Sequence, residues 1–112
     1  MADLVYLDEV NAIERLGGSK DMFMRLLKKF VQSLDKELSP YERVLDEATK
    51  EEFRREIHSI KGSAGSMGCT ALYEAATVCE KSVIDNNPDK MLHDTFVKIY
   101  AETKAYLTSY LS

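Results

Sequence analysis

Hydrophobic residues recur at helical spacing along almost the whole chain. Intervals of three and four residues predict a short helix over about residues 7–16 and four longer amphipathic helices after it. No segment alternates between apolar and polar residues over a useful length, so we expect no β-sheet. Four amphipathic helices joined by short connections predict an all-α fold, an antiparallel up-down four-helix bundle over about residues 19–111. The short first helix is expected to cover this bundle as a lid.

Capping residues predict where the first two helices begin and end. Gly17-Gly18 should end the first helix, and Ser19 is suited to cap the second. The apolar stripe of the second helix keeps its phase beyond Pro40, so one helix with a kink at Pro40 is the favoured prediction. A separate helix that starts at Ser39-Pro40 is the alternative.

The later helices carry signals of the same kind. Thr49 and Glu52 have the spacing of a capping box and should open the third helix, which ends near Gly68. The remaining predicted boundaries are Thr70 as the cap of the fourth helix, Asp85 as its approximate end, and Pro88 at the first position of a last helix over about residues 89–111.

The composition fits one soluble helical domain spanning residues 1–112. The chain is 45% hydrophobic and 30% charged, with only five glycines and two prolines. Its net charge of −4 argues against nonspecific binding to nucleic acid or to anionic membranes, because both require a basic excess. No stretch approaches the roughly 18 apolar residues of a membrane span, and the start lacks a signal peptide, so we expect cytoplasmic residence.

Neither the cysteines nor the histidines predict a metal site. Cys69 and Cys79 lack the paired spacing of zinc ligands, and Cys79 shares the apolar stripe of its helix, which indicates a core position. His93 has no nearby cations or glycines and is expected on the surface.

The run around His58 differs from the rest of the chain. At about 100° per residue, Arg54 and Lys61 fall within about 60° of His58 on a helix, as do Gly62 and Gly65. The opposite face carries the apolar residues Phe53, Ile57, Ile60, Ala64 and Met67. We therefore expect an exposed imidazole between two cations. Such cations favour the neutral, nucleophilic imidazole, which suits the handling of phosphate.

The two glycines on this face need a physical reason. Each costs roughly 0.8–1 kcal/mol relative to alanine inside a helix. Close approach of another backbone is the usual reason, and here it indicates a docking partner. Tight packing of Gly62 and Gly65 against a neighbouring helix of the same bundle is the alternative.

The segment His58-Ser59-Ile60-Lys61-Gly62-Ser63-Ala64 matches the H-x-x-K-G-[SA]-[SA] motif of histidine-containing phosphotransfer (HPt) domains. The chain resembles this family over nearly its whole length. The opening segment from Ala12 to Gly18 is similar to the lid helix and turn of the family. Gly68 corresponds to the glycine that closes the phosphohistidine helix, and Leu72 with Cys79-Glu80 resembles the pattern of the following helix.

The resemblance implies a phosphocarrier in a multistep His–Asp phosphorelay of two-component signal transduction. His58 would be the phosphoacceptor, Lys61 would offset phosphate charge, and Gly62 would leave room for a response-regulator receiver domain. Residues expected near the site or in receiver docking are Arg54, Ser63, Gly65, Met67 and Glu80.

The same resemblance implies no cofactor and no ATP site of the chain's own. Mg²⁺ is expected from the acidic pocket of the receiver domain, and a hybrid sensor histidine kinase is a further expected partner. A monomer is expected, because four helices can close a core by themselves.

Two other functions fit the residues. One is a non-catalytic helical adaptor whose basic patch binds an acidic partner. The other is the phosphohistidine domain of a chemotaxis-type kinase, which requires a dimerisation and ATP-binding region elsewhere.

Overall fold

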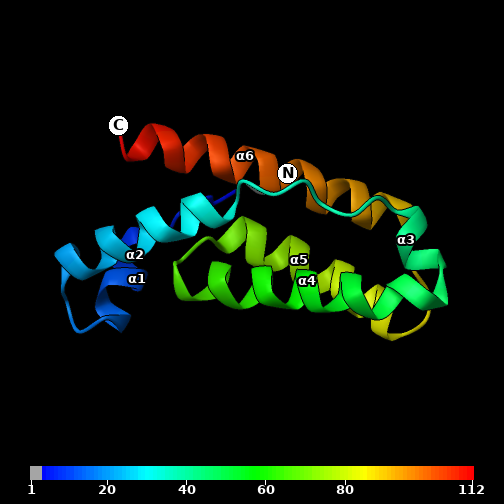
Figure 1. Cartoon of the computed structure of the whole chain (residues 1–112). Helices are drawn as coiled ribbons and strands as arrows, with labels where there is room; N and C mark the ends of the chain where they lie inside the picture. Colours follow the sequence, from blue (N-terminus) through cyan, green and yellow to red (C-terminus); the bar gives the residue numbers. More distant parts are fainter. Residues whose placement is uncertain (1–3) are drawn as a thin grey trace.

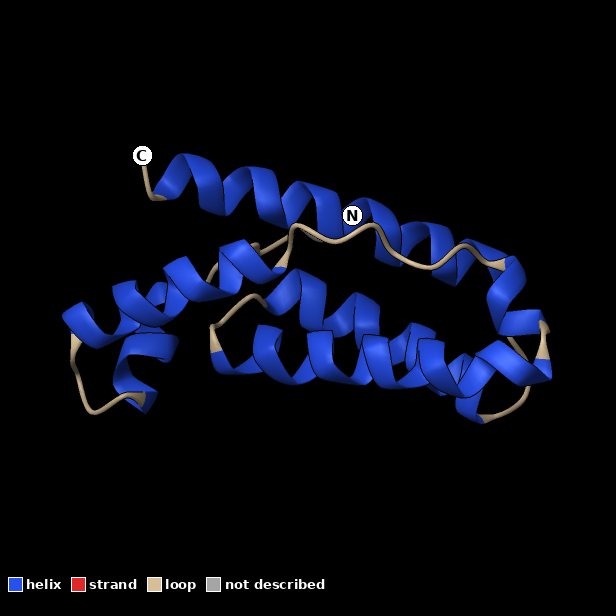
Figure 2. Ribbon diagram, in the orientation of Figure 1, coloured by secondary structure: helices blue, strands red, loops and turns tan. Residues whose placement is uncertain are grey.

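The computed structural model describes residues 4–112 of the chain. These residues form six helices and contain no strand, which confirms the all-α prediction (Figure 2). The helices are α1 (Glu9–Arg15), α2 (Lys20–Ser33), α3 (Glu42–Leu45), α4 (Glu47–Ser66), α5 (Thr70–Ile84) and α6 (Lys90–Tyr110). Within the described range, no helix combines the length and the apolar character that a membrane crossing requires.

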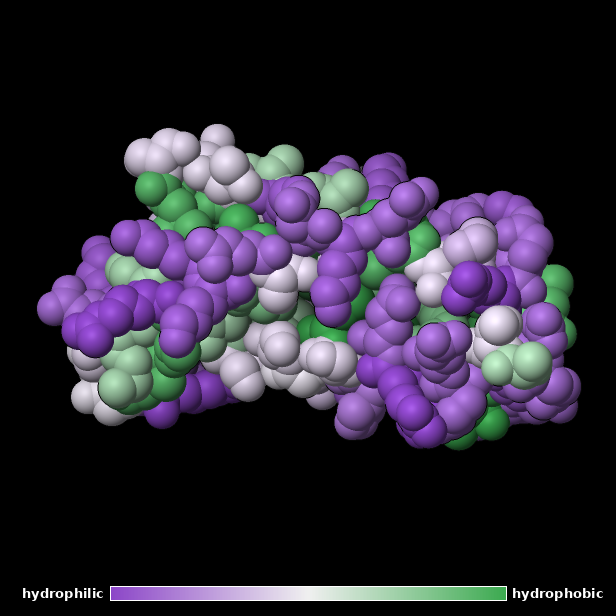
Figure 3. All heavy atoms as spheres, viewed as in Figure 1, coloured by the Kyte–Doolittle hydropathy of each residue, from purple (hydrophilic) through white to green (hydrophobic). Residues whose placement is uncertain are grey.

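The longest helices lie against one another in chain order. Figure 1 shows α4 and α5 side by side and running in opposite directions, with α6 along them. Helices α1 and α2 contact each other at one end of the molecule, where α2 also meets α6, and α3 packs on α4 at the other end. In the view of Figure 3, hydrophilic residues cover much of the surface, and hydrophobic residues show between them and at the edges of the molecule.

The core is built from one apolar stripe of each long helix. Its largest fully buried side chains include Phe23 and Leu27 from α2, Ile57 from α4, Leu72 from α5, and Phe96 and Leu107 from α6. Burying one such side chain contributes roughly 1.5–3 kcal/mol. The packing therefore fixes how each helix is rotated about its axis, and with it which residues of α4 face outward.

Local capping at the first two helices follows the sequence. Gly17 and Gly18 have φ angles of +74° and +85°, a region in which glycine avoids the steric cost of a side chain. They end α1, and their N–H groups donate to Glu14 O and Ile13 O. Ser19 caps α2, because its hydroxyl accepts from the backbone N–H of Met22 at 3.2 Å. Both predictions are confirmed.

The predicted start of α4 at Thr49 is wrong by two residues. The helix begins at Glu47, and the carboxylate of Asp46 caps it by accepting from Ala48 N at 2.9 Å. The Thr49 hydroxyl instead donates to Arg43 O at 2.6 Å, so it holds α3 against the start of α4. A carboxylate that reaches the free N–H groups replaces the expected capping box.

The starts of α5 and α6 also differ from prediction by one or two residues. Thr70 is the first residue of α5, and Cys69 is the cap without a side-chain hydrogen bond. Asp89 caps α6 by accepting from the N–H groups of Met91 and Leu92, so Pro88 precedes the cap. An aspartate beside the proline was the better capping signal.

The prediction of one second helix with a kink at Pro40 is also wrong. Helix α2 ends at Ser33, and residues 35–41 lead, without forming a regular helix, past α6 to the short α3 (Figure 1). Side-chain contacts hold this segment: Glu56 of α4 accepts from both the N–H and the hydroxyl of Ser39, and Lys104 of α6 donates to Asp35 at 2.6 Å. Pro40 lacks an N–H, so it weakens any helix through this point.

His93 was expected on the surface, and the structure contradicts this. Only 7% of its side chain is exposed, and its Nε2–H donates to Ser39 O at 3.0 Å. The rings of Tyr41 and Phe53 pack edge-on against it. Residues 35–41 cover His93, so its burial depends on a chain path that the periodicity of the sequence does not predict.

The two cysteines are core residues. Cys69 and Cys79 are almost completely buried and unpaired, which confirms the core position predicted for Cys79. Burial raises the pKa of each thiol to about 12.

Candidate functional site

His58 lies near the middle of α4 on the exposed side of the helix. Its side chain is 64% exposed, whereas its neighbour Ile57 is completely buried. Because Phe53, Ile57 and Ala64 are buried in the core, α4 cannot rotate to bury the imidazole. The predicted exposure of His58 is therefore confirmed.

A buried carboxylate from the next helix contacts the exposed imidazole. Oε2 of Glu80 lies 2.9 Å from Nδ1 of His58, and Oε1 lies 2.6 Å from Nζ of Lys61. Only 5% of the Glu80 side chain is exposed. One carboxylate of α5 thus links the two residues of α4 that the sequence assigned to phosphate chemistry.

The protonation state of Glu80 follows from its partners. Burial raises the pKa of the Glu80 carboxyl, but the hydrogen bonds from Lys61 and His58 outweigh burial and lower that pKa. The carboxylate is therefore ionised at neutral pH and can only accept hydrogen bonds. It follows that Nδ1 of His58 carries a hydrogen, so in the neutral form of the ring Nε2 is the nitrogen with the free lone pair.

Arg54 does not contact this cluster as the sequence suggested. Its guanidinium donates twice to the Glu51 carboxylate, from Nε at 3.0 Å and from Nη2 at 2.6 Å. This contact raises the pKa of Arg54 and lowers that of Glu51. Arg54 and Lys61 both have carboxylate partners, so negative charge offsets the two cations that were predicted beside His58.

The two glycines of the His58 face have different surroundings. A Cβ at Gly62 would meet nothing within 4 Å, so the backbone there is open to an approaching partner. A Cβ at Gly65 would lie 3.1 Å from the ring of Tyr73 on α5, and Gly65 O also accepts from Nη1 of Arg15 at 2.8 Å. Close packing within the molecule therefore explains Gly65, and docking stays a prediction for Gly62 alone.

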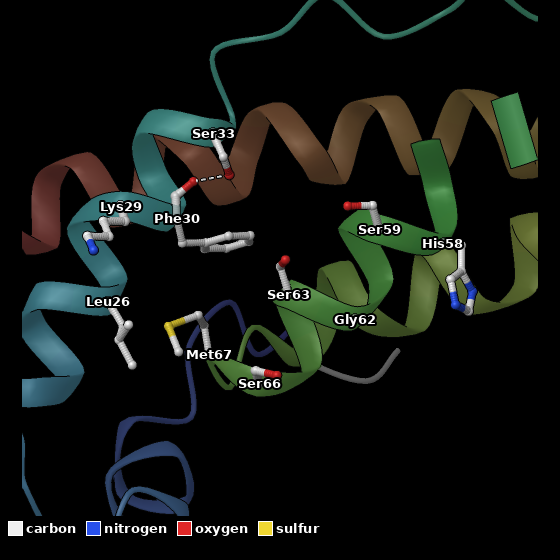
Figure 4. A pocket seen from close by; sticks show the side chains of 10 residues that line it. All are labelled: Leu26, Lys29, Phe30, Ser33, His58, Ser59, Gly62, Ser63, Ser66 and Met67. Carbon is white, nitrogen blue, oxygen red and sulfur yellow. Dashed lines mark hydrogen bonds between the residues drawn. The ribbon is translucent and has the colours of Figure 1, made fainter. Parts of the chain in front are cut away.

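A groove of about 570 Å³ runs between α2 and α4, with His58 at one end (Figure 4). Its lining comprises Leu26, Lys29, Phe30 and Ser33 of α2 and His58, Ser59, Gly62, Ser63, Ser66 and Met67 of α4. Met67, which was expected near the site or in receiver docking, is only 7% exposed and forms part of the groove wall. Ser63 is exposed within the groove.

Sequence reasoning missed the α2 side of this groove. Leu26 and Phe30 belong to the apolar stripe of α2. Such a stripe predicts packing in the core, but it does not show where a groove stays open between two helices. Lys29 adds a positive charge to the α2 side of the groove. Basic residues next to a helix stripe were the only signal, and they are too common to identify a site.

Residues 4–112 contain no cluster of three or more histidine, cysteine, aspartate or glutamate side chains placed to hold a metal ion.

Comparison with known protein families shows the family of this chain. The family model described as Hpt domain matches residues 25–108, a range that contains the groove, His58, Lys61 and Glu80. The chain belongs to the Hpt domain family. Hpt domains transfer phosphoryl groups on histidine in two-component phosphorelays, interact with receiver domains of response regulators, and act as phosphocarriers without an ATP site of their own. Helix α1 lies outside the matched range. Neither the curated proteins nor the solved structures contain a match to this Hpt chain.

Proposed function

We propose that this Hpt domain carries a phosphoryl group on Nε2 of His58. It accepts the group from a phosphorylated aspartate of one receiver domain and passes it to an aspartate of another. The observation that carries the proposal is an exposed imidazole whose Nδ1 is held by a buried carboxylate, within the H-x-x-K-G motif of the family. This contact leaves Nε2 as the nucleophile.

The transfer follows from this geometry. The Nε2 lone pair attacks the phosphorus of the aspartyl phosphate in line, the phosphorus–oxygen bond breaks, and the electron pair leaves with the aspartate carboxylate. Negative charge grows on the equatorial phosphoryl oxygens in the loose transition state. Lys61 is proposed to stabilise that charge, since its ammonium and the imidazole contact the two oxygens of the same Glu80 carboxylate. Mg²⁺ held by the acidic residues of a receiver domain would supply further positive charge for this step.

Docking is proposed at the α2–α4 face beside His58. Gly62 offers unobstructed backbone there, and the groove adds apolar walls and exposed hydroxyl groups such as that of Ser63. We further propose that α2, α4, α5 and α6 act together as an antiparallel four-helix bundle with α1 as its lid. In this proposal the domain works as a monomer in the cytoplasm.

Replacement of the acceptor tests the proposal. His58→Gln should keep the fold, because the side chain is mostly exposed, and should abolish labelling by a phosphorylated receiver domain. The measurement is transfer of acid-labile radiolabel, with thermal unfolding as the check on folding. Thr95→Ala, at an exposed position of α6 outside the groove, is the control and should still take up label.

Two results would contradict the phosphocarrier. Label that persists in His58→Gln would place the acceptor elsewhere. Stable binding of receiver domains without any transfer to the wild-type protein would instead support the helical adaptor.

A further inference from the structure

This inference rests on the proposed function and concerns the phosphorylated state of the same site. We propose that Glu80 is a positioning residue that holds a proton on Nδ1 of phosphorylated His58 and so makes the phosphoryl group easy to release. The basis is the contact between Nδ1 of His58 and Oε2 of Glu80 at 2.9 Å, with a Glu80 side chain that is only 5% exposed.

The chemistry of the nitrogen–phosphorus bond gives this contact its consequence. When the bond breaks, its electron pair returns to Nε2 and the phosphoryl group goes to an acceptor oxygen of water or of a carboxylate. If Nδ1 carries a proton, the leaving group is neutral imidazole, which needs no further proton. If Nδ1 is bare, the leaving group is an imidazolate anion, which is a much poorer leaving group. The fraction of phosphohistidine protonated at Nδ1 therefore controls the rate of discharge.

A carboxylate at hydrogen-bond distance favours the protonated ring. An opposite charge within about 4–6 Å stabilises the charged form of an ionisable group, typically by one to three pH units. Phosphorylation makes the imidazole cationic when Nδ1 is protonated, and Glu80 is the carboxylate that faces this nitrogen. Because Glu80 is buried, solvent screens the interaction less than it would at the surface.

The other charged groups around the ring have defined positions. On α4, Lys61 binds the second oxygen of Glu80, and Arg54 is paired with Glu51. On α2, Lys29 lines the groove that ends at His58. These cations oppose protonation of the ring, and Lys61 also draws on the charge of Glu80. Removal of Glu80 and removal of Lys61 should therefore have opposite effects.

Chemical phosphorylation tests the inference without any receiver domain. Purified protein is phosphorylated with potassium phosphoramidate, and decay of the phosphohistidine signal is followed by ³¹P NMR between about pH 5 and about pH 9, the range that brackets imidazole titration. His58→Gln identifies the signal that belongs to His58. Glu80→Gln should move the midpoint of the pH–rate profile to lower pH and lengthen the half-life above that midpoint by about tenfold, which corresponds to a shift of one pH unit.

Two further variants make the result specific. Lys61→Met should move the midpoint to higher pH, because Glu80 then interacts with the ring alone. Glu74→Gln removes the same charge from an exposed position of α5 and should leave the midpoint where it is in the wild type. Thermal unfolding of each variant shows that the proteins compared are folded.

The outcomes separate this inference from the proposed function. A Glu80→Gln profile that superimposes on the wild type overturns the inference, while transfer from receiver domains to His58 still stands. If Glu80→Gln does not fold, an unchanged midpoint in Lys61→Met overturns it instead. Absence of receiver-dependent transfer, with the predicted pH shifts present, overturns the proposed function and not the role of Glu80.

Discussion

At the scale of single residues, the two glycines of the His58 face show what helical spacing can predict. Spacing places Gly62 and Gly65 on the same face as His58, and the structure agrees. It does not say what lies above each of them. Tyr73 covers Gly65 because α5 packs there, whereas Gly62 faces open space. The role of each glycine depends on contacts with neighbouring helices. Spacing along a single helix gives no information about those contacts.

Substitution of these glycines should give opposite effects on stability. Gly62→Ala should raise the free energy of unfolding by up to about 1 kcal/mol, because alanine is the better helix former and meets no neighbour. Gly65→Leu should lower it by about 1–3 kcal/mol, because its side chain must displace the Tyr73 ring. Urea unfolding of both variants measures the difference. Equal or higher stability of Gly65→Leu would contradict internal packing at this position.

Glu80 is a second residue whose contacts could not be predicted from helical spacing. The sequence places it near the phosphohistidine only through resemblance to the family, and a carboxylate near phosphate looks unfavourable there. The structure shows a carboxylate that contacts Nδ1 of His58 and Nζ of Lys61 rather than the free side of the ring. Because the two helices meet through residues 22 positions apart, pairing across α4 and α5 was not predictable from local spacing.

At the scale of helices and connections, local signals predicted the end of α1 and the start of α2, but they missed the local carboxylate caps of α4 and α6. Ser19 and Gly17-Gly18 act on N–H and carbonyl groups within a few residues, and their predictions hold. The start of α5 is different, because Val5 O accepts from Ala71 N at 2.8 Å where a capping side chain was expected. Residues 35–41 follow the helical period but are held by contacts with α4 and α6. Partners distant in sequence override propensity in both cases.

Gly68 joins the N-terminal segment to the turn between α4 and α5, and its substitution tests that connection. Its φ is +75°, and a Cβ would lie 2.6 Å from Asp8 O. The Asp8 N–H also donates to Gly68 O at 2.7 Å. Gly68→Ala should therefore lower the free energy of unfolding by roughly 2–3 kcal/mol, through backbone strain and displacement of the segment.

The matched control for Gly68 is Gly18→Ala. Gly18 also has a positive φ, at +85°, but a Cβ there would meet nothing within 4 Å. Backbone strain alone should then lower the free energy of unfolding of Gly18→Ala, by roughly 1 kcal/mol. Urea unfolding compares the two variants. Equal losses would show that the close approach of Asp8 contributes nothing measurable.

At the scale of the whole molecule, most acidic residues among those described lie at the surface, whereas Glu80 is buried. The exposed carboxylates of Asp35, Glu51 and Asp94 have pKa values lowered by hydrogen bonds from Lys104, Arg54 and Lys90. Exposed pairs of this kind contribute little to stability. Glu80 differs because its partners hold a buried charge, so its protonation should have the larger effect on folding.

The dependence of stability on acid follows from the sign of this shift. Burial raises the pKa of Glu80 and the hydrogen bonds from Lys61 and His58 lower it further than burial raises it, so the folded value lies below the ordinary 4.5. The unfolded chain then binds the proton more tightly, and the stabilisation is complete above about pH 4.5 and lost as pH falls through the folded pKa. Glu80→Gln cannot titrate, so its free energy of unfolding should fall less than that of the wild type between neutral pH and about pH 3. Urea unfolding at a series of pH values measures how the free energy of unfolding depends on pH in the wild type and in Glu80→Gln. The same pH dependence in both proteins would mean that the ionised Glu80 carboxylate, with its partners Lys61 and His58, adds nothing to the stability of the fold.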